Sequence, residues 1–415
     1  MRHRWIRRIA RILSAIGLVG ALAACAPPAE PPDTITLAMW ATLPAEANAM
    51  DRAIAAFKTA TGITVKKVVI TDKYMDVIRS RFAARITPDV MYLDSAEAPF
   101  LIKSDVLLPL DAALQDPADF PSQFLDAFRG DDHHLYGIPK DYSTLALYVN
   151  TDLLAAAGWR IADIPRDEDG LMAFALKLQK RLPRGVGAML FEADLARHLS
   201  AIEAFGQPIT DREGNATLTG VPGVEAYLQA YVDGRRAGAL LSPKDDLGAD
   251  SPGAAFGAGK AVMMIEGPWA LASLHQDFPA VKFVTLPTPT VNGKPQTMAF
   301  VVGYSIPKYA RNPAGGIRFA QYMTSAGAAD WSRYAGLLPV RRSVQARVAA
   351  TQDPLLAAHI AGVPYATVWS RGTSLPAIES NFSNQFLAAL NGSITVHQAL
   401  ARAQAAANRE IERER

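Results

Sequence analysis

One stretch of the chain organises the rest: residues 135–150, with the sequence LYGIPKDYSTLALYVN. It combines residues that favour β-strands with Pro139, which fixes φ, and it sets an acid beside an aromatic ring at Asp141 and Tyr142. A strand-like run of this length with polar groups in its middle indicates a segment held at both ends. We interpret it as a crossing from one lobe to another past a ligand cleft. The alternative is an ordinary core strand with a surface turn at Pro139.

The length of the chain, 415 residues, predicts two domains, because a single hydrophobic core rarely grows that large. Half of the residues are apolar and a fifth are charged, which is a globular balance. Residues 1–24 differ, since a start rich in arginine is followed by an apolar, uncharged run over 12–24. This layout is typical of an export signal, and its apolar part is shorter than a membrane span requires.

The single cysteine, Cys25, follows this signal in the sequence LAAC. This resembles the lipobox of bacterial lipoproteins, which implies cleavage before Cys25 and lipid attachment to its sulfur. An exported protein anchored at the cell envelope by acyl chains would follow, with the proline-rich residues 25–33 as a tether. The alternative is a plain secretory signal with an incidental cysteine. A lone cysteine forms no internal disulfide and has no metal-ligand partners at the usual spacing.

The slight basicity of the chain belongs to the signal. The full sequence has 42 Lys and Arg against 40 Asp and Glu. Without residues 1–24, which hold five arginines and no acid, the net charge becomes −3. Binding to nucleic acid therefore has no electrostatic support, and we expect no nucleic-acid partner.

The pattern after the tether alternates strands with helices. The spacing of apolar residues predicts a strand at 34–40, a helix that ends at Gly62, a strand at 63–70 and a third, apolar strand at 88–93 that ends at Asp94. Strands that alternate with helices predict an α/β fold with a parallel sheet covered on both faces.

Helical patterns dominate the middle of the chain and strands return later. Residues 167–258 read mostly as helices, and strands are predicted again at 260–265, 281–286 and 298–306. A charged amphipathic helix is expected from 395 to about 413. The chain thus leaves one domain, builds another and returns, with two or three crossings. Such crossings flank a cleft between domains, which is a favoured ligand site.

A series of short motifs extends over nearly all of the mature chain. They are the lipobox, the strand at 35–40, Pro88-Asp89-Val90, residues 106–111, residues 136–158, residues 256–263 leading into Gly267-Pro268-Trp269, residues 303–307 and residues 338–341. Each is weak alone, but their order and spacing are similar to the extracellular solute-binding proteins of bacterial ABC importers. The resemblance is to the sugar-binding family that includes maltose-binding protein.

The resemblance implies an α/β fold of two lobes with an interdomain cleft and a multi-crossing hinge, the clamshell of periplasmic binding proteins. Carried onto this chain, lobe 1 comprises residues 34–141 plus 266–308, and lobe 2 residues 142–265 plus 309–415. Val149 departs from the family, because many relatives have an aromatic or polar residue before the asparagine. This leaves the fold unchanged but puts the packing at the crossing in doubt.

A sugar site needs aromatic rings against the apolar C–H faces of the sugar, and carboxylates, amides or arginines for its hydroxyls. Trp40 and Asp94 end predicted strands, where open sheets bind ligands. Their alternatives are a core tryptophan and a helix N-cap. Asp141 and Tyr142 lie at the predicted crossing.

Further candidates for the site occur later in the chain. Trp269 follows a predicted buried strand and should point at the cleft, and Glu266 either bonds there or favours the positive end of the next helix. Gly303 would let the backbone approach a ligand. The full set of predicted ligand-binding residues is Trp40, Asp94, Asp141, Tyr142, Glu266, Trp269, Gly303, Tyr304, Trp369 and Arg371.

Catalytic patterns are weak throughout the sequence. Residues 253–261 have the wrong glycine spacing for a phosphate loop, and no G-x-S-x-G motif occurs. His133 and His134 have no nearby carboxylate frame for a metal. We therefore predict no catalytic residue, no metal and no cofactor, and leave a secreted glycosidase as a remote alternative.

The resulting hypothesis is a monomeric, lipid-anchored binding protein that captures a sugar and delivers it to the transmembrane subunits of an ABC permease. The number of candidate rings favours a di- or oligosaccharide over a monosaccharide. Glycerol phosphates and polyamines are the alternative ligands for the same fold. A phosphate would need several Arg or Lys in the cleft, and a polyamine several acids with few donors.

Overall fold

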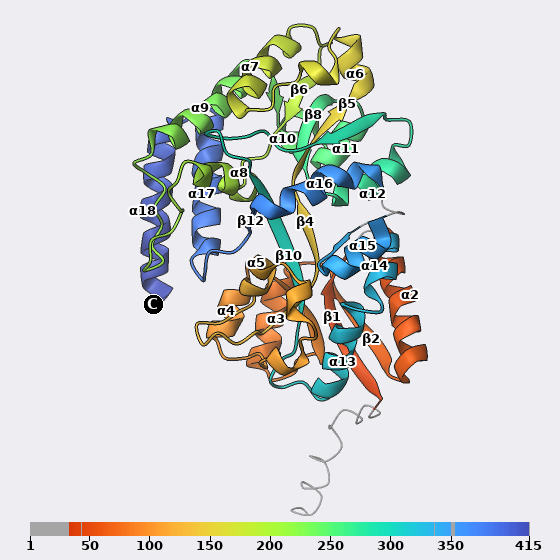
Figure 1. Ribbon diagram of the computed structural model, residues 1–415. Helices are drawn as coiled ribbons and strands as arrows, with labels where there is room; N and C mark the ends of the chain where they lie inside the picture. Colours follow the sequence, from red (N-terminus) through yellow and green to blue (C-terminus); the bar gives the residue numbers. More distant parts are fainter. Residues whose placement is uncertain (1–32, 43, 336, 350–352, 415) are drawn as a thin grey trace, which may run out of the picture.

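The computed structural model describes residues 33–42, 44–335, 337–349 and 353–414. The predicted signal at 1–24, the lipidation site Cys25 and all but the last residue of the tether lie outside these ranges. The described chain forms an elongated molecule of two lobes, one above the other in Figure 1.

Strands occur in both halves of the chain, and short ones interrupt the helical middle. They are β1 (Thr34–Trp40), β2 (Thr64–Ile70), β3 (Val90–Asp94), β4 (Ile138–Thr144), β5 (Ala146–Asn150), β6 (Gly187–Leu190), β7 (Leu240–Leu241), β8 (Ala261–Glu266), β9 (Phe283–Leu286), β10 (Thr297–Ser305), β11 (Leu338–Pro339) and β12 (Ala366–Val368). The strands predicted from alternation are thus present within a few residues, whereas β6, β7, β11 and β12 were not predicted.

Helices cover both sheets. They are α2 (Pro44–Thr61), α3 (Tyr74–Ala83), α4 (Ala98–Lys103), α5 (Ser122–Asp126), α6 (Thr151–Ala156), α7 (Glu168–Gln179), α8 (Leu195–Ala204), α9 (Pro222–Arg236), α10 (Pro243–Leu247), α11 (Pro252–Gly257), α12 (Trp269–Asp277), α13 (Pro313–Met323), α14 (Ala328–Ala335), α15 (Arg342–Val348), α16 (Ala357–Gly362), α17 (Leu375–Leu390) and α18 (Val396–Glu414). Short 3-10 helices lie at Asp111–Ala113, Pro117–Asp119, Ile161–Asp163, Pro354–Leu356 and Val363–Tyr365.

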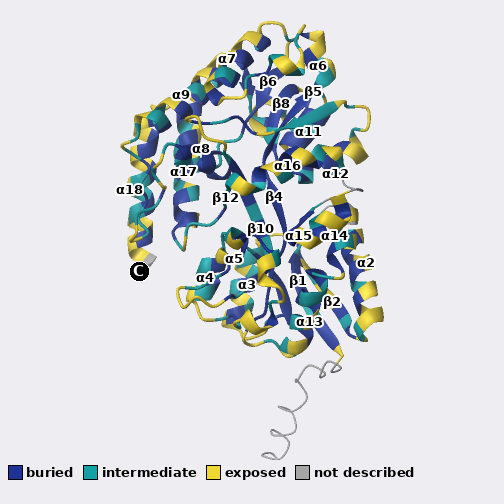
Figure 2. Ribbon diagram, viewed as in Figure 1, coloured by how far each residue is buried: buried dark blue, intermediate teal, exposed yellow. Residues whose placement is uncertain are grey.

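The strands form two separate sheets, one in each lobe. In the described chain the first sheet has the order β11-β4-β10-β3-β1-β2, with β12 paired to β10, and the second has the order β7-β6-β8-β5-β9. We call the lobe built on the first sheet the first lobe and the other the second lobe. Figure 2 shows the buried strands at the centre of each lobe and the exposed faces of the helices outside.

The stretch at 135–150 is a crossing between these sheets, as predicted. Its first part, β4, pairs with β10 and β11 in the first sheet. Its second part, β5, pairs with β8 and β9 in the second. Every residue of both strands is buried, which explains the long run of β-formers. The alternative of a single core strand with a surface turn is therefore wrong.

A buried histidine of α16 holds the two parts of the crossing together. His359 Nδ1 lies 2.7 Å from the Thr144 carbonyl oxygen, at the end of β4. Its Nε2 lies 3.0 Å from the Tyr148 hydroxyl, on β5. Burial lowers the pKa of His359 to about 4, so the ring is neutral at physiological pH. One ring nitrogen can then donate while the other accepts.

The lobe boundaries differ from those predicted. Strand β9, expected in lobe 1, pairs with β5 in the second sheet. Helices α13 and α14, expected in lobe 2, pack on β1 and β3 and on α2 of the first lobe. The first lobe is thus completed by helices that come late in the chain. The predicted boundaries followed the order of the strands along the chain, which does not indicate that β9 and the two helices belong to the other lobe.

Candidate functional site

The carboxyl ends of strands from both sheets meet where the lobes join. In the first sheet β1 runs parallel to β3, and these strands end at Trp40 and Asp94. In the second sheet β6 runs parallel to β8, which ends at Glu266. Glu266 is the partner of Ala146, just past the end of β4. The two edges therefore face one another across the junction of the lobes (Figure 1), the usual ligand position in open α/β sheets.

A cluster of carboxylates spans this junction. Asp94 and Glu97 come from the first lobe, and Asp194 and Glu379 from the second, on the segment before α8 and on α17. We call these four residues the interlobe acidic cluster. Burial raises the pKa of Glu379 to about 7, and the charges of Asp194, Asp94 and Glu97 add to the effect. This coupling places acids of both lobes within electrostatic range of one another.

The pKa of Asp94 is raised for the same reason as that of Glu379. Burial raises its pKa to about 7, although its carboxylate accepts a hydrogen bond of 2.8 Å from the Ala96 backbone nitrogen, which lowers the pKa. The neighbouring Glu97 raises it again. Glu97 itself forms an ion pair of 2.8 Å with Arg79. Asp94 and Glu379 thus stay partly protonated near neutral pH and can donate as well as accept hydrogen bonds.

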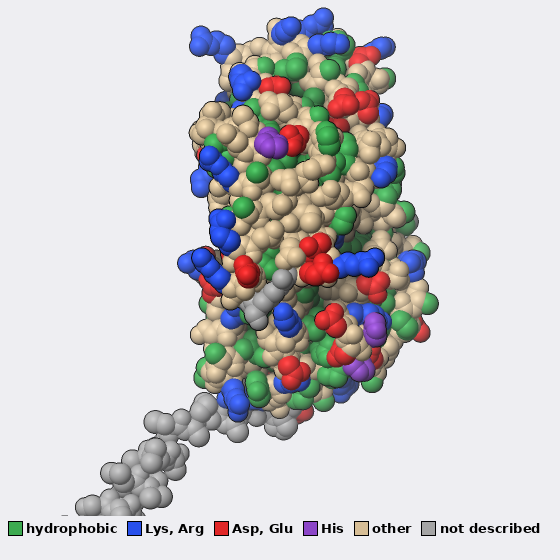
Figure 3. Space-filling view, turned by 90° about the vertical axis from the view of Figure 1, so that its left-hand side faces the viewer, with side chains coloured by type: hydrophobic (Ala, Val, Ile, Leu, Met, Phe, Trp, Pro, Cys, Tyr) green, Lys and Arg blue, Asp and Glu red, His purple; other side chains and the backbone are tan. Residues whose placement is uncertain are grey.

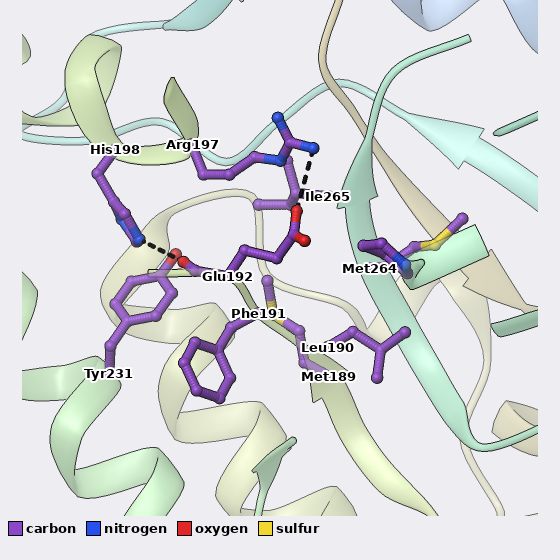
Figure 4. A pocket seen from close by; sticks show the side chains of 10 residues that line it. Met189, Leu190, Phe191, Glu192, Arg197, His198, Tyr231, Met264 and Ile265 are labelled. Atoms are coloured by element: carbon purple, nitrogen blue, oxygen red, sulfur yellow. Dashed lines mark hydrogen bonds and ion pairs between the residues drawn. The ribbon is translucent and has the colours of Figure 1, made fainter. Parts of the chain in front are cut away.

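Arg197 of α8 organises the second-lobe side of the junction. One of its terminal nitrogens lies 2.9 and 3.1 Å from the two carboxylate oxygens of Glu266. The same nitrogen lies 3.1 Å from Glu192, and Figure 4 shows this ion pair. Burial raises the pKa of Glu266 to about 7, and the guanidinium opposes this rise. Sequence reasoning proposed Glu266 as a ligand residue but missed its partner Arg197.

A small cavity lies beside this arginine. It has a volume of about 20 Å³, and its lining includes Glu192, Arg197 and His198 (Figure 4). The Nε atom of Arg197 is buried and has no hydrogen-bond partner among the described residues. The volume suffices for one water molecule. A water here would complete the hydrogen bonds of the guanidinium.

Trp269 is held in a fixed orientation next to the acids. Its Nε1 donates a hydrogen bond to Glu266, and the guanidinium of Arg197 lies 5.7 Å from the centre of its ring. Gly267 has no side chain, and a Cβ at this position would lie 2.2 Å from the Trp269 ring. The glycine thus permits the ring to fold back over the end of β8.

Trp269 is the first of three neighbouring aromatic rings at the hinge. Phe300 lies 5.7 Å from Trp269 and 6.2 Å from Trp369, measured between ring centres. The Trp369 backbone bonds both to the Ala299 carbonyl (2.8 Å) and to the Ser95 hydroxyl of the first lobe (3.0 Å). We call Trp269, Phe300 and Trp369 the aromatic wall. Trp369 is nearly buried, whereas Trp269 and Phe300 are half-exposed.

Trp40 lies on the first-lobe side. Its half-buried ring packs edge-on against Tyr74 and Tyr92, with ring centres 5.3 and 5.0 Å away. The ring contacts found for the described residues do not connect it to the aromatic wall. Trp40 and Trp269 therefore belong to opposite sides of the junction.

The structure does not support Asp141 as a direct ligand residue. Its carboxylate is buried, forms an ion pair with Lys140 and accepts a hydrogen bond of 2.9 Å from Trp331 Nε1. The Lys140 ammonium lies 4.5 and 4.6 Å from the ring centres of Tyr92 and Trp331. The Asp141 carboxylate thus links β4 to α14 inside the first lobe.

Three other predicted residues are also buried in the first lobe. Tyr142 packs against Phe124 of α5, and its hydroxyl accepts a hydrogen bond from Gln345 (2.8 Å). Tyr304 packs between Tyr92 and Phe319. A side chain at Gly303 would meet Phe128, at 3.1 Å. All three residues lie within paired strands, and their contacts are with other residues of the first lobe.

Arg371 has a positioning role. It forms an ion pair with Glu203 of α8 and donates to the backbone carbonyls of Val368 and Ser370. It also borders a groove of about 590 Å³ between the lobes, whose lining includes Lys103 of α4 and Arg212. Figure 3, which views the molecule from this side, shows acidic and basic side chains interspersed over the face. Arg371 thus shapes the outer end of the junction.

Several residues of the junction were missed from the sequence, namely Glu97, Glu192, Asp194, Arg197, Phe300 and Glu379. Glu192 and Asp194 follow the unpredicted strand β6, so the strand-end rule would have found them once that strand was known. Glu379 lies within a helix far along the chain, and nothing in its local sequence indicates a site.

The described residues contain no group of three or more His, Cys, Asp or Glu arranged to hold a metal ion. Within the same ranges, none of the helices combines the length and apolar character needed to cross a membrane.

Residues 52–358 match the family of bacterial extracellular solute-binding proteins. The chain belongs to this family. Among curated proteins, a binding protein of Brucella abortus is 25% identical over 234 residues. This match covers 54% of each chain, so the chain spans about half the length of the curated relatives it matches.

Solved structures of two-lobe binding proteins share the fold. The ABC substrate-binding protein Lmo0181 of Listeria monocytogenes, in complex with cycloalternan, gives a TM-score of 0.81 at 20% identity over 91% of this chain and 99% of that one. The sugar-binding protein MalE of Xanthomonas citri gives 0.79 at 19% over 92% and 98%. UgpB of Mycobacterium tuberculosis, in complex with glycerophosphocholine, gives 0.78 at 20% over 91% and 98%. The predicted family and the two-lobe fold are confirmed.

Proposed function

We propose that this solute-binding protein captures a saccharide, of two or more units, between its lobes and delivers it unchanged to the transmembrane subunits of an ABC permease. The aromatic wall beside carboxylates from both lobes is the observation that carries this proposal. Rings pack against the apolar faces of a sugar, and carboxylates bind its hydroxyls through charge-assisted hydrogen bonds.

Lobe closure supplies the mechanism of capture. A ligand that touches Trp269 on one side and Asp94 on the other gains its full set of contacts only when the lobes approach. Such a ligand shifts the equilibrium between open and closed forms toward the closed one. The permease would then distinguish loaded from empty protein by the relative position of the lobes.

The finer parts of the proposal concern location and ligand. We propose that the lipid on Cys25 anchors the mature protein at the cell envelope and that it works as a monomer. Structural neighbours in complex with cycloalternan and with mannotriose support an oligosaccharide ligand. Glycerophosphocholine, bound by another neighbour, carries a phosphate that the interlobe acidic cluster repels and a choline cation that it attracts. Polyamines remain the second candidate, favoured by the same acids.

A thermal-shift screen over saccharides, glycerol phosphates and polyamines tests the proposal, with product analysis of every hit. We expect a saccharide to raise the melting temperature and to be recovered unchanged, and the Trp269→Ala variant to lose the response. Conversion of the saccharide would show an enzyme instead. Stabilisation by glycerol phosphates or polyamines alone would replace the proposed ligand class.

A further inference from the structure

Arg197 lies between two carboxylates and an aromatic ring at the second-lobe edge of the junction. One terminal nitrogen is 2.9 and 3.1 Å from the carboxylate oxygens of Glu266 and 3.1 Å from Glu192. The guanidinium carbon is 5.7 Å from the ring centre of Trp269. Trp269 Nε1 in turn donates a hydrogen bond to Glu266. The arginine and the indole therefore share one acceptor, and each also contacts the other.

The Glu266 carboxylate depends on these two partners. The residue is 3% exposed, and the side-chain hydrogen bonds and ion pairs found for it within the described ranges come from Arg197 and Trp269. A buried carboxylate without a cation takes up a proton instead of staying charged. A neutral carboxyl is a weaker acceptor for the indole N–H than a carboxylate is. The charge of Arg197 therefore strengthens the hydrogen bond that orients Trp269.

A second arginine at the junction shows a different geometry. Arg371 faces Glu203 with two nitrogens, its Nε at 2.8 Å, which is the paired arrangement favoured by a guanidinium and a carboxylate. Arg197 reaches both of its acids with one terminal nitrogen, and its buried Nε has no hydrogen-bond partner in the described part of the chain. Its guanidinium lies over Trp269 instead. The position of Arg197 thus serves Glu266 and the indole together, not the strongest ion pair with one acid.

We propose that Arg197 is a positioning residue of the sugar site, which through Glu266 holds the Trp269 indole in the orientation that packs against a ligand. This inference rests on the proposed function and adds a residue that acts through another side chain. Arg197 belongs to the first turn of α8, Glu266 ends β8 and Trp269 begins α12. The arginine therefore fixes three elements relative to one another at the edge of the junction.

The charge of Glu266 provides a test that needs no ligand. Burial raises its pKa to about 7, the charge of Arg197 lowers it, and the charges of Glu192 and Asp194 raise it. The Tyr148 hydroxyl also interacts electrostatically with Glu266. These groups come from β5, from α8 and from the segment between β6 and α8.

The indole N–H of Trp269 reports this titration directly. A 15N–1H spectrum of the tryptophan indoles, recorded from pH 5 to 9, follows the hydrogen bond to Glu266, and Trp269→Phe assigns the resonance. We expect the resonance to move with a midpoint near pH 7, as Glu266 gains its charge. Circular dichroism checks that each variant is folded.

Two variants should move this midpoint in opposite directions. Arg197→Met keeps an apolar stem without the charge and should raise the midpoint by at least about 1 pH unit. Arg197→Lys keeps the charge and should stay closer to wild type. Glu192→Gln removes a charge that opposes ionisation of Glu266 and should lower the midpoint. This second shift tests the inference even if Arg197→Met does not fold.

Arg181→Met is the matched control. The Arg181 guanidinium lies 4.9 Å from the ring centre of Trp159, so this arginine also packs on a tryptophan. The two residues follow α7 and α6, which lie at the far end of the second lobe in Figure 1. The control should leave the Trp269 midpoint unchanged. No rise in Arg197→Met, or an equal rise in Arg181→Met, would overturn the inference.

Calorimetry with maltose, mannotriose and cycloalternan, the sugars bound to structural neighbours, measures the effect on capture. A sugar that binds the wild type should bind Arg197→Met about 10-fold more weakly and Arg181→Met equally well. Unchanged affinity in Arg197→Met overturns its role in the sugar site and leaves saccharide capture intact. If none of these sugars binds the wild type, saccharide capture loses its support, whereas the midpoint still decides whether Arg197 holds the indole.

Discussion

Asp94 and Asp141 flank the same residue of the first sheet, yet they have opposite surroundings. Both are paired with Val302 of β10, one from β3 and the other from β4. Asp141 is buried with Lys140 and Trp331 as partners. Asp94 is half-exposed at the junction of the lobes, with a backbone nitrogen as its hydrogen-bond donor. An acid on a strand of this sheet therefore does not by itself mark a ligand site.

The difference comes from the neighbouring cation and the covering helix. Lys140 directly precedes Asp141, and α14 closes over the pair with Trp331. Burying such a pair is tolerated because each charge has a partner. Asp94 has the second lobe opposite it, and that lobe offers further acids. Asp141 thus has its partners within the first lobe, whereas Asp94 at the junction is free to contact a ligand.

The largest expected effect comes from breaking the buried ion pair between Lys140 and Asp141. Lys140→Met leaves the Asp141 carboxylate buried without its counter-ion, and it should lower the free energy of unfolding by about 3–5 kcal/mol. Urea denaturation monitored by circular dichroism measures this. The double variant Lys140→Met/Asp141→Asn removes both charges and should recover most of the loss. If Lys140→Met lowers the free energy of unfolding by less than about 1 kcal/mol, Asp141 does not depend on Lys140 as its counter-ion.

The next effect concerns ligand binding at the aromatic wall. Trp269→Ala removes the ring that Glu266 and Gly267 hold in place. It should weaken binding of the saccharide found by thermal shift by about 10- to 100-fold in calorimetry. Trp269→Phe keeps a ring and should lose less. An affinity equal to wild type in the alanine variant would remove the aromatic wall from the site.

Neutralising the two aspartates should affect stability differently. Asp94→Asn removes a charge whose ionised form is disfavoured, so at pH 8 the free energy of unfolding should stay within about 0.5 kcal/mol of wild type or increase. Asp141→Asn leaves Lys140 buried without its partner and should be destabilising. Parallel urea titrations compare them, and equal destabilisation by both changes would refute the distinction.

A further effect is a pH dependence of stability. Folding raises the pKa values of Asp94 and Glu379 to about 7, above their usual values of 3.8 and 4.5. Between about pH 4.5 and 7 the folded protein therefore binds more protons than the unfolded chain, and stability should fall as the pH rises. Asp94→Asn should flatten this slope in urea titrations at pH 5.5 and 8. A slope unchanged in the variant would show that Asp94 does not contribute.

The sequence predicted the fold because alternation and strand ends are local signals. The crossing at 135–150, the paired lobes and the position of Trp269 after β8 all follow from such patterns. It could also have excluded one prediction, since Asp141 and Tyr142 are adjacent in a strand and point to opposite faces. Both could not face the same cleft.

The interlobe acidic cluster could not be predicted in this way. Its members come from β3, the segment before α8 and α17, far apart in sequence. Their meeting depends on how the two lobes are placed, and no local pattern reports that. The lobe boundaries failed for the same reason, because α13 and α14 return to cover the first sheet.

Small-angle X-ray scattering with and without a stabilising saccharide tests most directly whether the ligand closes the two lobes. We predict that the radius of gyration falls on binding. We also predict that the unliganded Asp94→Asn/Glu379→Gln variant, in which the repulsion is weakened, is more compact than the unliganded wild type. A radius that stays the same when the saccharide binds would contradict capture between the lobes.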